Sequence, residues 1–290
     1  MNDNTKTARI AVIGGDARQI YLARTLADDG YTVRTYGIDN TDGVYADIPG
    51  VTKCDAVADA TACCRAVIFP VKPKESINDH IDKIDSEPGT VIFAWNPDAQ
   101  TVDSIAARGW VLFDLASDEA LTVKNAQLTA EGSLSLFMNE KSTAVLGSRI
   151  LVLGSGRVAK CVCRTFSALG ADVTMMARSA GELAWAELSR WGIVDVLDET
   201  ARLRALSSGY DAIINTIPTP LLSGCALDAI PGGTLVIDLA SAPYGIDPDR
   251  ARLHGITAYR ASALPGKYAP AAAASLIAEC VRRHLRGGVR

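Results

Sequence analysis

Short apolar runs alternate with longer stretches of mixed polarity along almost the whole chain. Runs rich in β-branched and aromatic residues, spaced about a helix length apart, are typical of buried parallel strands joined by helices. Two such series predict an α/β chain with two doubly wound parallel-sheet domains. The runs are Arg9–Gly15, Tyr31–Gly37, Arg65–Val71, Gly89–Trp95 and Gly109–Leu115, then Arg149–Gly156, Ala171–Ser179, Tyr210–Pro218 and Gly233–Ser241.

Two helical patterns divide the chain further. A proline-free segment with regularly spaced leucines lies between the two series and predicts a linking helix, and an alanine-rich segment near the end predicts a closing helix. Whether the closing helix returns to the first domain stays open. The expected parts are an N-terminal substrate-side domain (1–124), the linking helix (125–143), a Rossmann dinucleotide-binding domain (144–268) and the C-terminal helix (269–290).

A glycine-rich turn opens the second series. The run Gly154-Ser155-Gly156-Arg157-Val158-Ala159 fits the dinucleotide fingerprint, directly after one expected strand and at the start of an expected helix. Gly154 permits the tight turn, Gly156 lets the backbone approach a pyrophosphate, and Ala159 lets the helix pack closely. The positive helix end then stabilises the phosphates. The run predicts a dinucleotide site that includes Ser155, Arg157 and Val158.

The end of the next strand selects between the two nicotinamide dinucleotides. An acidic residue is usual there when the ribose carries a free 2′-hydroxyl, but this strand ends in Arg178-Ser179. A guanidinium and a hydroxyl suit a 2′-phosphate, so we expect NADP, with NAD as the alternative. An Arg178 that only faces solvent is the competing interpretation.

Two later strand ends are expected at the same crevice, because ligands of open α/β sheets lie beyond the carboxyl ends of the strands. Turn chemistry explains the same residue types equally well. The candidate cofactor contacts are Thr216, Ile217 and Pro218 at the first end and Asp238 and Leu239 at the second.

The first domain carries glycines with a different spacing. Gly14-Gly15-Asp16 does not fit the dinucleotide motif, and the Asp16 carboxylate would repel a phosphate. Arg18, near the start of the following helix, is suited to a carboxylate. The first domain is therefore expected to hold the substrate.

Several phrases together resemble the dipicolinate synthase family of spore-forming bacteria, in particular its A-subunit. They are IAVIGGDARQ, TAEG, VLGSGRVA, INTIP, DLAS and LPGKYAP, spread over nearly the whole chain. The resemblance implies a sporulation enzyme: an NAD(P)-dependent dehydrogenase that oxidises the cyclic dihydrodipicolinate-type product of the lysine pathway to pyridine-2,6-dicarboxylate. It also implies a partner, the flavoprotein-like B-subunit of the same synthase.

A cyclic substrate with two carboxylates needs cations or hydroxyls around it. The candidates are Arg18, Ser241 and Lys267, assisted by backbone N–H groups of Gly14, Gly15 and Gly266. Glu131 is either a general base, if partly buried, or the ion-pair partner of Arg18, which is the favoured interpretation. The family pattern is broken at 271–274, where four alanines stand in place of a Thr-Ala-Gly-like sequence.

Composition narrows the class of protein. A net charge of -4 and a pI near 5.5 argue against nucleic-acid binding, and the chain shows no secretory signal and no bilayer-length apolar run. We therefore expect a cytoplasmic protein without a membrane segment, with homo-oligomerisation left open. The seven cysteines lack metal-ligand spacing and are expected to be reduced and mostly buried, with no metal.

The histidines and the domain plan leave alternatives. His80, His254 and His284 lie outside the site motifs, and surface or helix-end roles are expected for them. A 2-hydroxyacid, alanine or shikimate-type dehydrogenase has the same plan, although a 2-hydroxyacid enzyme would need a histidine in its crevice. The alternative that is not an enzyme is a non-catalytic subunit that senses NADP.

Overall fold

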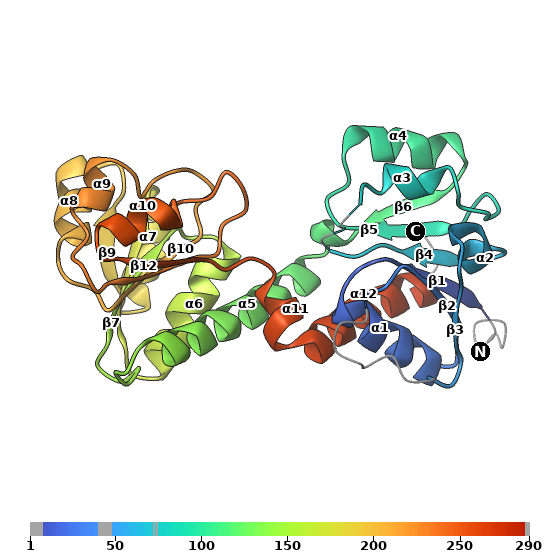
Figure 1. Cartoon of the computed structure of the whole chain (residues 1–290), viewed down its shortest axis with the longest axis horizontal. Coiled ribbons are helices and arrows are strands. Elements are labelled where there is room, and N and C mark those ends of the chain that lie inside the picture. The colour runs from blue at the N-terminus through green and yellow to red at the C-terminus, as the bar shows by residue number, and fades with distance from the viewer. Residues whose placement is uncertain (1–7, 40–47, 72, 74, 288–290) are drawn as a thin grey trace. The chain divides into compact units, whose positions relative to one another are not determined.

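The computed structural model describes residues 8–39, 48–71, 73 and 75–287. The chain divides into two compact units, here called unit 1 (Met1–Asn125 with Pro265–Arg290) and unit 2 (Ala126–Leu264). Each contains a parallel six-stranded sheet flanked by helices (Figure 1). The predicted α/β fold class is confirmed. Among the described residues no helix is long and apolar enough to cross a membrane.

Unit 1 has the strand order β3-β2-β1-β4-β5-β6. Its order reverses between β1 and β4, which defines the point where open α/β sheets bind ligands. The strands are β1 (Arg9–Ile13), β2 (Thr32–Tyr36), β3 (Val51–Lys53), β4 (Ala66–Ile68), β5 (Val91–Ala94) and β6 (Val111–Asp114). The helices are α1 (Ala17–Asp28), α2 (Val57–Thr61), α3 (Asn78–Ile81), α4 (Ala99–Ala107) and α12 (Pro270–Gly287), with the 3-10 turn Leu115–Ser117 before α5 (Glu119–Glu140).

Unit 2 repeats this topology with the order β12-β11-β10-β7-β8-β9. The corresponding reversal lies between β7 and β10. The strands are β7 (Arg149–Leu153), β8 (Asp172–Ala177), β9 (Gly192–Asp195), β10 (Ala212–Asn215), β11 (Leu235–Asp238) and β12 (Thr257–Arg260). The helices are α6 (Arg157–Ala168), α7 (Ala180–Leu188), α8 (Glu199–Leu206), α9 (Cys225–Asp228) and α10 (Pro248–Leu253), and α11 (Leu264–Tyr268) runs from unit 2 into unit 1.

Alternation along the central strands builds a core on both faces of each sheet. Ile10 and Val12 of β1 pack with α1 and α12, whereas Ala11 and Ile13 pack on the opposite face with residues of α2, α3 and α4. In unit 2, the residues of β7 divide in the same way between the side of α5 and α6 and the side of α8, α9 and α10. Strands covered on both faces must be apolar throughout, as these are.

The sequence pattern missed three strands, β3, β9 and β12. Each lies at an edge of its sheet, and most of its residues are exposed or half-buried. An edge strand that faces solvent needs no continuous apolar run, so the pattern had no signal there.

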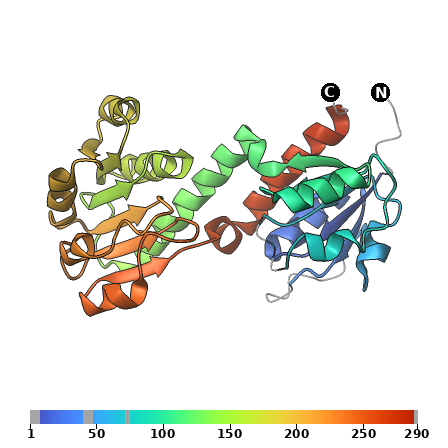
Figure 2. The same ribbon diagram turned by 90° about the horizontal axis from the view of Figure 1, so that it is seen from above.

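The C-terminal helix α12 packs against α1 in unit 1, as Figures 1 and 2 show. Ala274, Ile277 and Val281 are buried in the same cluster as residues of α1 and β1. In the four-alanine segment 271–274, the last two residues are buried and the first two are exposed. The departure from the family pattern thus places two small side chains where α12 meets the core.

The helix expected over 125–143 is α5, which begins at Glu119. Asp118 caps it, since its carboxylate accepts a hydrogen bond of 2.9 Å from the N–H of Leu121. The early start follows from this capping, which the leucine pattern alone did not locate.

Candidate functional site

The glycine turn of unit 2 is built so that only glycine fits its first position. Gly154 has φ +110°, and its N–H donates to the carbonyl of Met176 at 2.9 Å. A Cβ added to Gly154 would overlap Oγ1 of Thr216. Sterics and the backbone angle therefore both require glycine at this position.

The second glycine is open. Gly156 is the N-cap of α6 and offers no side-chain acceptor to the first N–H groups of the helix. A Cβ added there would meet no atom within 4 Å. Ala159 is fully buried and brings α6 close to β7. These features fit a dinucleotide pyrophosphate, which needs close backbone approach and uncapped N–H groups at a helix start.

The end of β8 holds a carboxylate that the sequence analysis did not identify. Arg178 and Ser179 are exposed, and the hydroxyl of Ser179 caps α7 by accepting from the N–H of Glu182 at 3.3 Å. The hydroxyl of Ser155 donates to Oε2 of Glu182. An acidic group thus lies at the glycine turn although the strand ends in Arg178. Glu182 stands in the first turn of α7, beyond the strand-end position at which an acidic residue is usual, so that position gave no sign of it.

The segment after β10 joins the glycine turn. Thr216 donates to the carbonyl of Leu153 through its hydroxyl at 2.8 Å and its N–H at 2.9 Å. Ile217 is half-buried and lies against Gly154, while Pro218 is exposed. Thr216 and Ile217 therefore lie beside Gly154 in unit 2, and contact of this segment with a cofactor stays a prediction.

Asp238, at the end of β11, was expected to contact the cofactor, and its environment contradicts this. Its side chain is fully buried, and its oxygens accept from Nδ2 of Asn215 at 2.8 Å and from three backbone N–H groups. These donors are Ala240 at 3.2 Å, Gly245 at 2.7 Å and Ile246 at 3.3 Å. A carboxylate with no exposed surface cannot touch a cofactor, so Asp238 positions the loops instead. Leu239 is half-buried and packs against the core.

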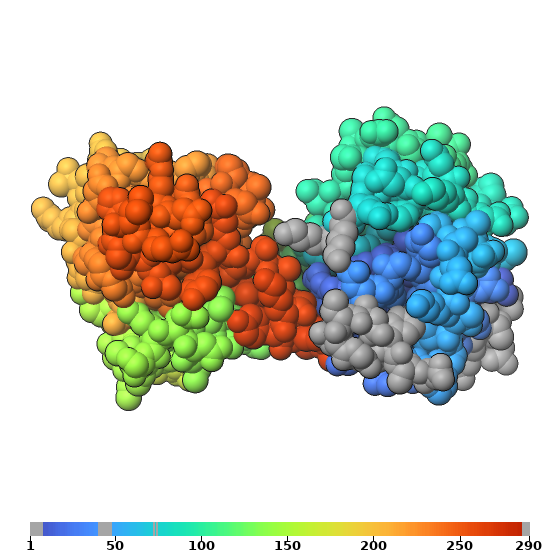
Figure 3. All heavy atoms as spheres, in the orientation of Figure 1, coloured from blue at the N-terminus to red at the C-terminus, as the bar shows by residue number. Residues whose placement is uncertain are grey.

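Ser241 begins the surface loop held by Asp238. The loop contains a cis Ala242-Pro243 bond and Tyr244 at φ +68°. The guanidinium of Arg260 lies 4.8 Å from the centre of the Tyr244 ring and donates to the carbonyl of Ile246. Ser241 itself is exposed, and Figure 3 shows this loop and α10 (orange) at the surface of unit 2.

In unit 1, the glycine pair leads into a charge pair formed by the partly exposed Asp16 and the buried Arg18. Asp16 caps α1, and both its oxygens accept from Arg18, Oδ1 from Nε at 2.8 Å and Oδ2 from Nη2 at 2.7 Å. Burial raises the pKa of Asp16, but the hydrogen bonds and charge of Arg18 outweigh it and hold that pKa below its usual value. The Arg18 side chain is only 6% exposed.

The short helix α11 reaches this charge pair. A Cβ added to Gly266 would lie 2.7 Å from Nε of Arg18, so the backbone approaches the guanidinium closely. The structure therefore brings together Arg18, Gly266 and the glycine pair, four of the expected substrate residues. One expected donor is already used, because the N–H of Gly14 donates to the carbonyl of Tyr36 at 2.7 Å.

Glu131 belongs to unit 2 and Arg18 to unit 1. Within unit 1, the carboxylate that pairs with Arg18 is Asp16, two residues before it. Within unit 2, Glu131 is exposed and accepts from Nε2 of Gln127 at 3.3 Å, so that unit alone does not supply the partial burial that the general-base role requires. The ion pair of Glu131 with Arg18 stays a prediction. Lys267, in the last turn of α11, is also exposed.

A pocket of about 160 Å³ opens beside the glycine pair of unit 1. It lies at the carboxyl ends of β1, β2 and β4, where the strand order reverses. Its lining combines backbone, aromatic and acidic groups: Ile13, Gly14, Gly15, Tyr36, Gly37, Asp39, Phe69, Pro70, Pro73, Glu75 and His80.

His80 is the pocket residue that the sequence analysis missed. It lies near the end of a four-residue helix, as expected for a helix-end histidine, but it also lines the pocket. Its Nε2 lies 3.2 Å from Oε2 of Glu75, and its side chain is 12% exposed. No sequence signal could have found His80, since tertiary packing alone brings it to Gly14.

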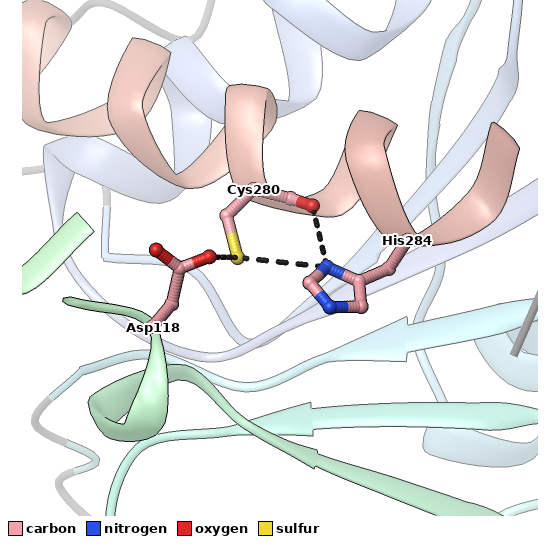
Figure 4. A group of neighbouring side chains, drawn as sticks. All are labelled: Asp118, Cys280 and His284. Atoms are coloured by element: carbon pink, nitrogen blue, oxygen red, sulfur yellow. Dashed lines mark hydrogen bonds between the residues drawn. The ribbon is translucent and has the colours of Figure 1, made fainter. Parts of the chain in front are cut away.

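A second cluster, Asp118, Cys280 and His284, joins α12 to the start of α5 (Figure 4). The Cys280 thiol donates to Oδ2 of Asp118 at 3.3 Å, and Nδ1 of His284 lies 2.9 Å from the Cys280 carbonyl. Arg283 donates to the same Asp118 oxygen at 2.7 Å. The carboxylate is thus neutralised by a guanidinium and occupied by a thiol, which suits a structural connection rather than cation binding.

Thiol reactivity tests this assignment. Burial, together with the hydrogen bond to Asp118, raises the pKa of Cys280 to about 12, and burial raises that of Cys64 to about 11. Of the seven free cysteines three are buried, two are half-buried, and Cys63 and Cys225 are exposed, so the expectation of mostly buried thiols is only partly met. At pH 8 we expect a maleimide to label Cys63 and Cys225 and to spare Cys280 until the chain is unfolded, as peptide mass mapping would show. Rapid labelling of Cys280 in the folded chain would contradict the assignment.

Comparison with known proteins places these features in a family. A family model for the N-terminal domain of the dipicolinate synthase A-subunit matches residues 9–91. The curated dipicolinate synthase A-subunit of Bacillus subtilis (strain 168) is 31% identical over 292 residues, covering 96% of this chain and 95% of that protein.

Solved structures agree with the sequence matches. The dipicolinate synthase A chain from Bacillus subtilis has 29% identity and a TM-score of 0.79, covering 97% of this chain and 96% of that one. The dipicolinate synthase A-subunit from Bacillus halodurans has 28% identity and a TM-score of 0.80, covering 96% and 97%. A transhydrogenase from Sinorhizobium meliloti, at 16% identity and a TM-score of 0.66 over 93% and 91% of the two chains, shares the fold alone.

Proposed function

Because this chain belongs to the A-subunit family of dipicolinate synthase, we propose that it is an NADP-dependent dehydrogenase of dipicolinate formation. The substrate would be the cyclic dihydrodipicolinate-type diacid and the product pyridine-2,6-dicarboxylate. We further propose that it acts during sporulation, in the cytoplasm, with a second, flavoprotein-like subunit. Its fold is that of dehydrogenases with nucleotide-binding Rossmann-type domains, which supports NAD(P) as the cofactor.

The glycine turn of unit 2 is the observation that carries the proposal. Gly154 admits no side chain, and Gly156 leaves open space over an uncapped start of α6. Both properties match the demands of a pyrophosphate at a Rossmann turn. Arg178, exposed at the end of β8, is the residue proposed to contact a 2′-phosphate.

The pocket of unit 1 is proposed to hold the ring of the substrate. A cavity of about 150 Å³ is known to accept benzene, so a pocket of about 160 Å³ suits a single six-membered ring. Tyr36, Phe69 and His80 supply flat walls for it. Arg18, three residues after Gly15 and in the first turn of α1, is proposed to attract a substrate carboxylate.

The reaction removes a hydride and a proton from the ring. A bound oxidised nicotinamide supplies the hydride acceptor, and the chain must then take up only the proton. His80 and Glu75, paired at 3.2 Å in the pocket, are the groups proposed to receive it, since imidazole is the commonest general base. Aromatisation of the ring favours the product, so no stronger base is required.

A direct assay tests the proposal. Freshly generated cyclic diacid is mixed with the purified chain and either NADP or NAD, with and without the second subunit, and pyridine-2,6-dicarboxylate is measured. Product from this chain with NADP supports the dehydrogenase. Tight NADP binding without product under any condition would reject the enzyme and favour the NADP-sensing role.

Arg18→Gln tests the carboxylate contact. A charged hydrogen bond contributes about 2 kcal/mol, so we expect KM for the diacid to rise roughly 30-fold with dinucleotide affinity unchanged. Steady-state kinetics and dinucleotide titration measure the two effects, and Arg24→Gln, at an exposed position of the same helix α1, is the matched control. An unchanged KM in a folded Arg18→Gln variant would remove Arg18 from the substrate site.

A further inference from the structure

The carboxylate of Glu182 lies where a Rossmann domain distinguishes its two dinucleotides. Glu182 is in the first turn of α7, the helix that follows β8, and it is half-buried. The adenosine ribose of a bound dinucleotide is read at the end of this strand, by an acidic residue for a free 2′-hydroxyl or by an arginine for a 2′-phosphate. This chain has both residue types there, Arg178 and Glu182.

Two contacts fix Glu182 at the turn. Its Oε2 accepts from the hydroxyl of Ser155, between the two glycines, and its N–H donates to the hydroxyl of Ser179 at 3.3 Å. The first contact ties the carboxylate to the loop that would hold the pyrophosphate, and the second holds the backbone from which the side chain projects. Glu182 is therefore directed at the glycine turn, unlike Glu187 of the same helix, which is exposed.

We infer that Glu182 is a specificity-determining residue that favours a free 2′-hydroxyl and opposes a 2′-phosphate, so that the chain accepts NAD as well as NADP. The inference rests on the proposed dinucleotide site. A carboxylate accepts a hydrogen bond from a ribose hydroxyl, whereas it repels a phosphate that carries nearly two negative charges at neutral pH. Arg178 attracts that phosphate, and the two side chains act in opposite directions.

Equilibrium binding of each dinucleotide gives a readout that is independent of turnover. The dissociation constants of NADP and NAD are measured by calorimetry for the wild type and for Glu182→Gln, Glu187→Gln and Arg178→Gln. Thermal unfolding of each variant establishes that it is folded. Glutamine keeps the shape of glutamate and can still accept from Ser155, so the comparison isolates the charge.

We expect Glu182→Gln to increase the preference for NADP over NAD by about tenfold, mainly through tighter NADP binding. Arg178→Gln should shift the preference by a similar factor toward NAD, and Glu187→Gln should change it less than twofold. A Glu182→Gln preference within twofold of the wild type, with both dinucleotides still bound, would overturn the inference but leave the dinucleotide site intact. A folded wild type that binds neither dinucleotide would instead reject the proposed function, and the inference with it.

Discussion

Gly154→Ala is expected to abolish measurable dinucleotide binding and to destabilise unit 2. The added Cβ would overlap Oγ1 of Thr216, and φ +110° is a conformation that side-chain-bearing residues rarely adopt. Overpacking and backbone strain each cost about 1–3 kcal/mol, so the turn would have to move to relieve them. Moving it displaces the start of α6, and we expect affinity for NADP to fall at least about 100-fold.

Gly156→Ala tests whether weaker binding comes from filling the space of the ligand or from distorting the glycine turn. Gly156 has an ordinary φ of -69°, and a Cβ there meets nothing within 4 Å, so the variant should fold with wild-type stability. If a pyrophosphate approaches this backbone, the added methyl group still weakens binding. Titration with NADP and thermal unfolding measure both properties. Wild-type NADP affinity in both alanine variants would mean that this turn does not bind the dinucleotide.

The central parts of the fold could be predicted because burial on two faces leaves a continuous apolar signal. β1 and β7 are almost entirely buried, and their runs were recognised with the turns that follow them. β9 and β12 were not recognised, because an edge strand can be polar without cost to the core. The strands that the sequence pattern did not predict are therefore those whose positions do not require apolar residues.

The candidate site could be predicted from the sequence where its geometry requires a given residue type at a fixed spacing along the chain. Gly154 and Gly156 belong to such a motif, since the geometry of a tight turn demands glycine at fixed spacing. His80 and Glu182 do not, because each reaches its site through tertiary contacts, His80 with Glu75 in the pocket and Glu182 with Ser155 at the turn. The prediction for Asp238 was wrong for a different reason. A carboxylate at a strand end suggests a ligand contact, but this one is buried and accepts from backbone N–H groups.

Asp238→Ala is expected to produce the largest loss of stability in unit 2. The substitution leaves three buried backbone N–H groups without their side-chain acceptor. It also removes one of the two acceptors of the Asn215 amide, which keeps only the carbonyl of Ile217. Removing one partner of a buried charged network costs about 3–5 kcal/mol, a large part of the 5–15 kcal/mol that stabilises an ordinary domain.

Hydrogen exchange can resolve the effect of Asp238→Ala by unit. We expect amides of β10, β11 and the 240–246 loop to lose protection, whereas those of β1 and α1 keep theirs, because the two units have separate cores. Asp249→Ala is the matched control, since that carboxylate is 88% exposed and its ion pair with Arg252 contributes less than about 1 kcal/mol. Wild-type protection in β10 and β11 of Asp238→Ala would show that the loops keep their positions without the carboxylate. Asp238 would then not be the residue that positions the loops after β10 and β11, and its burial would need a different explanation.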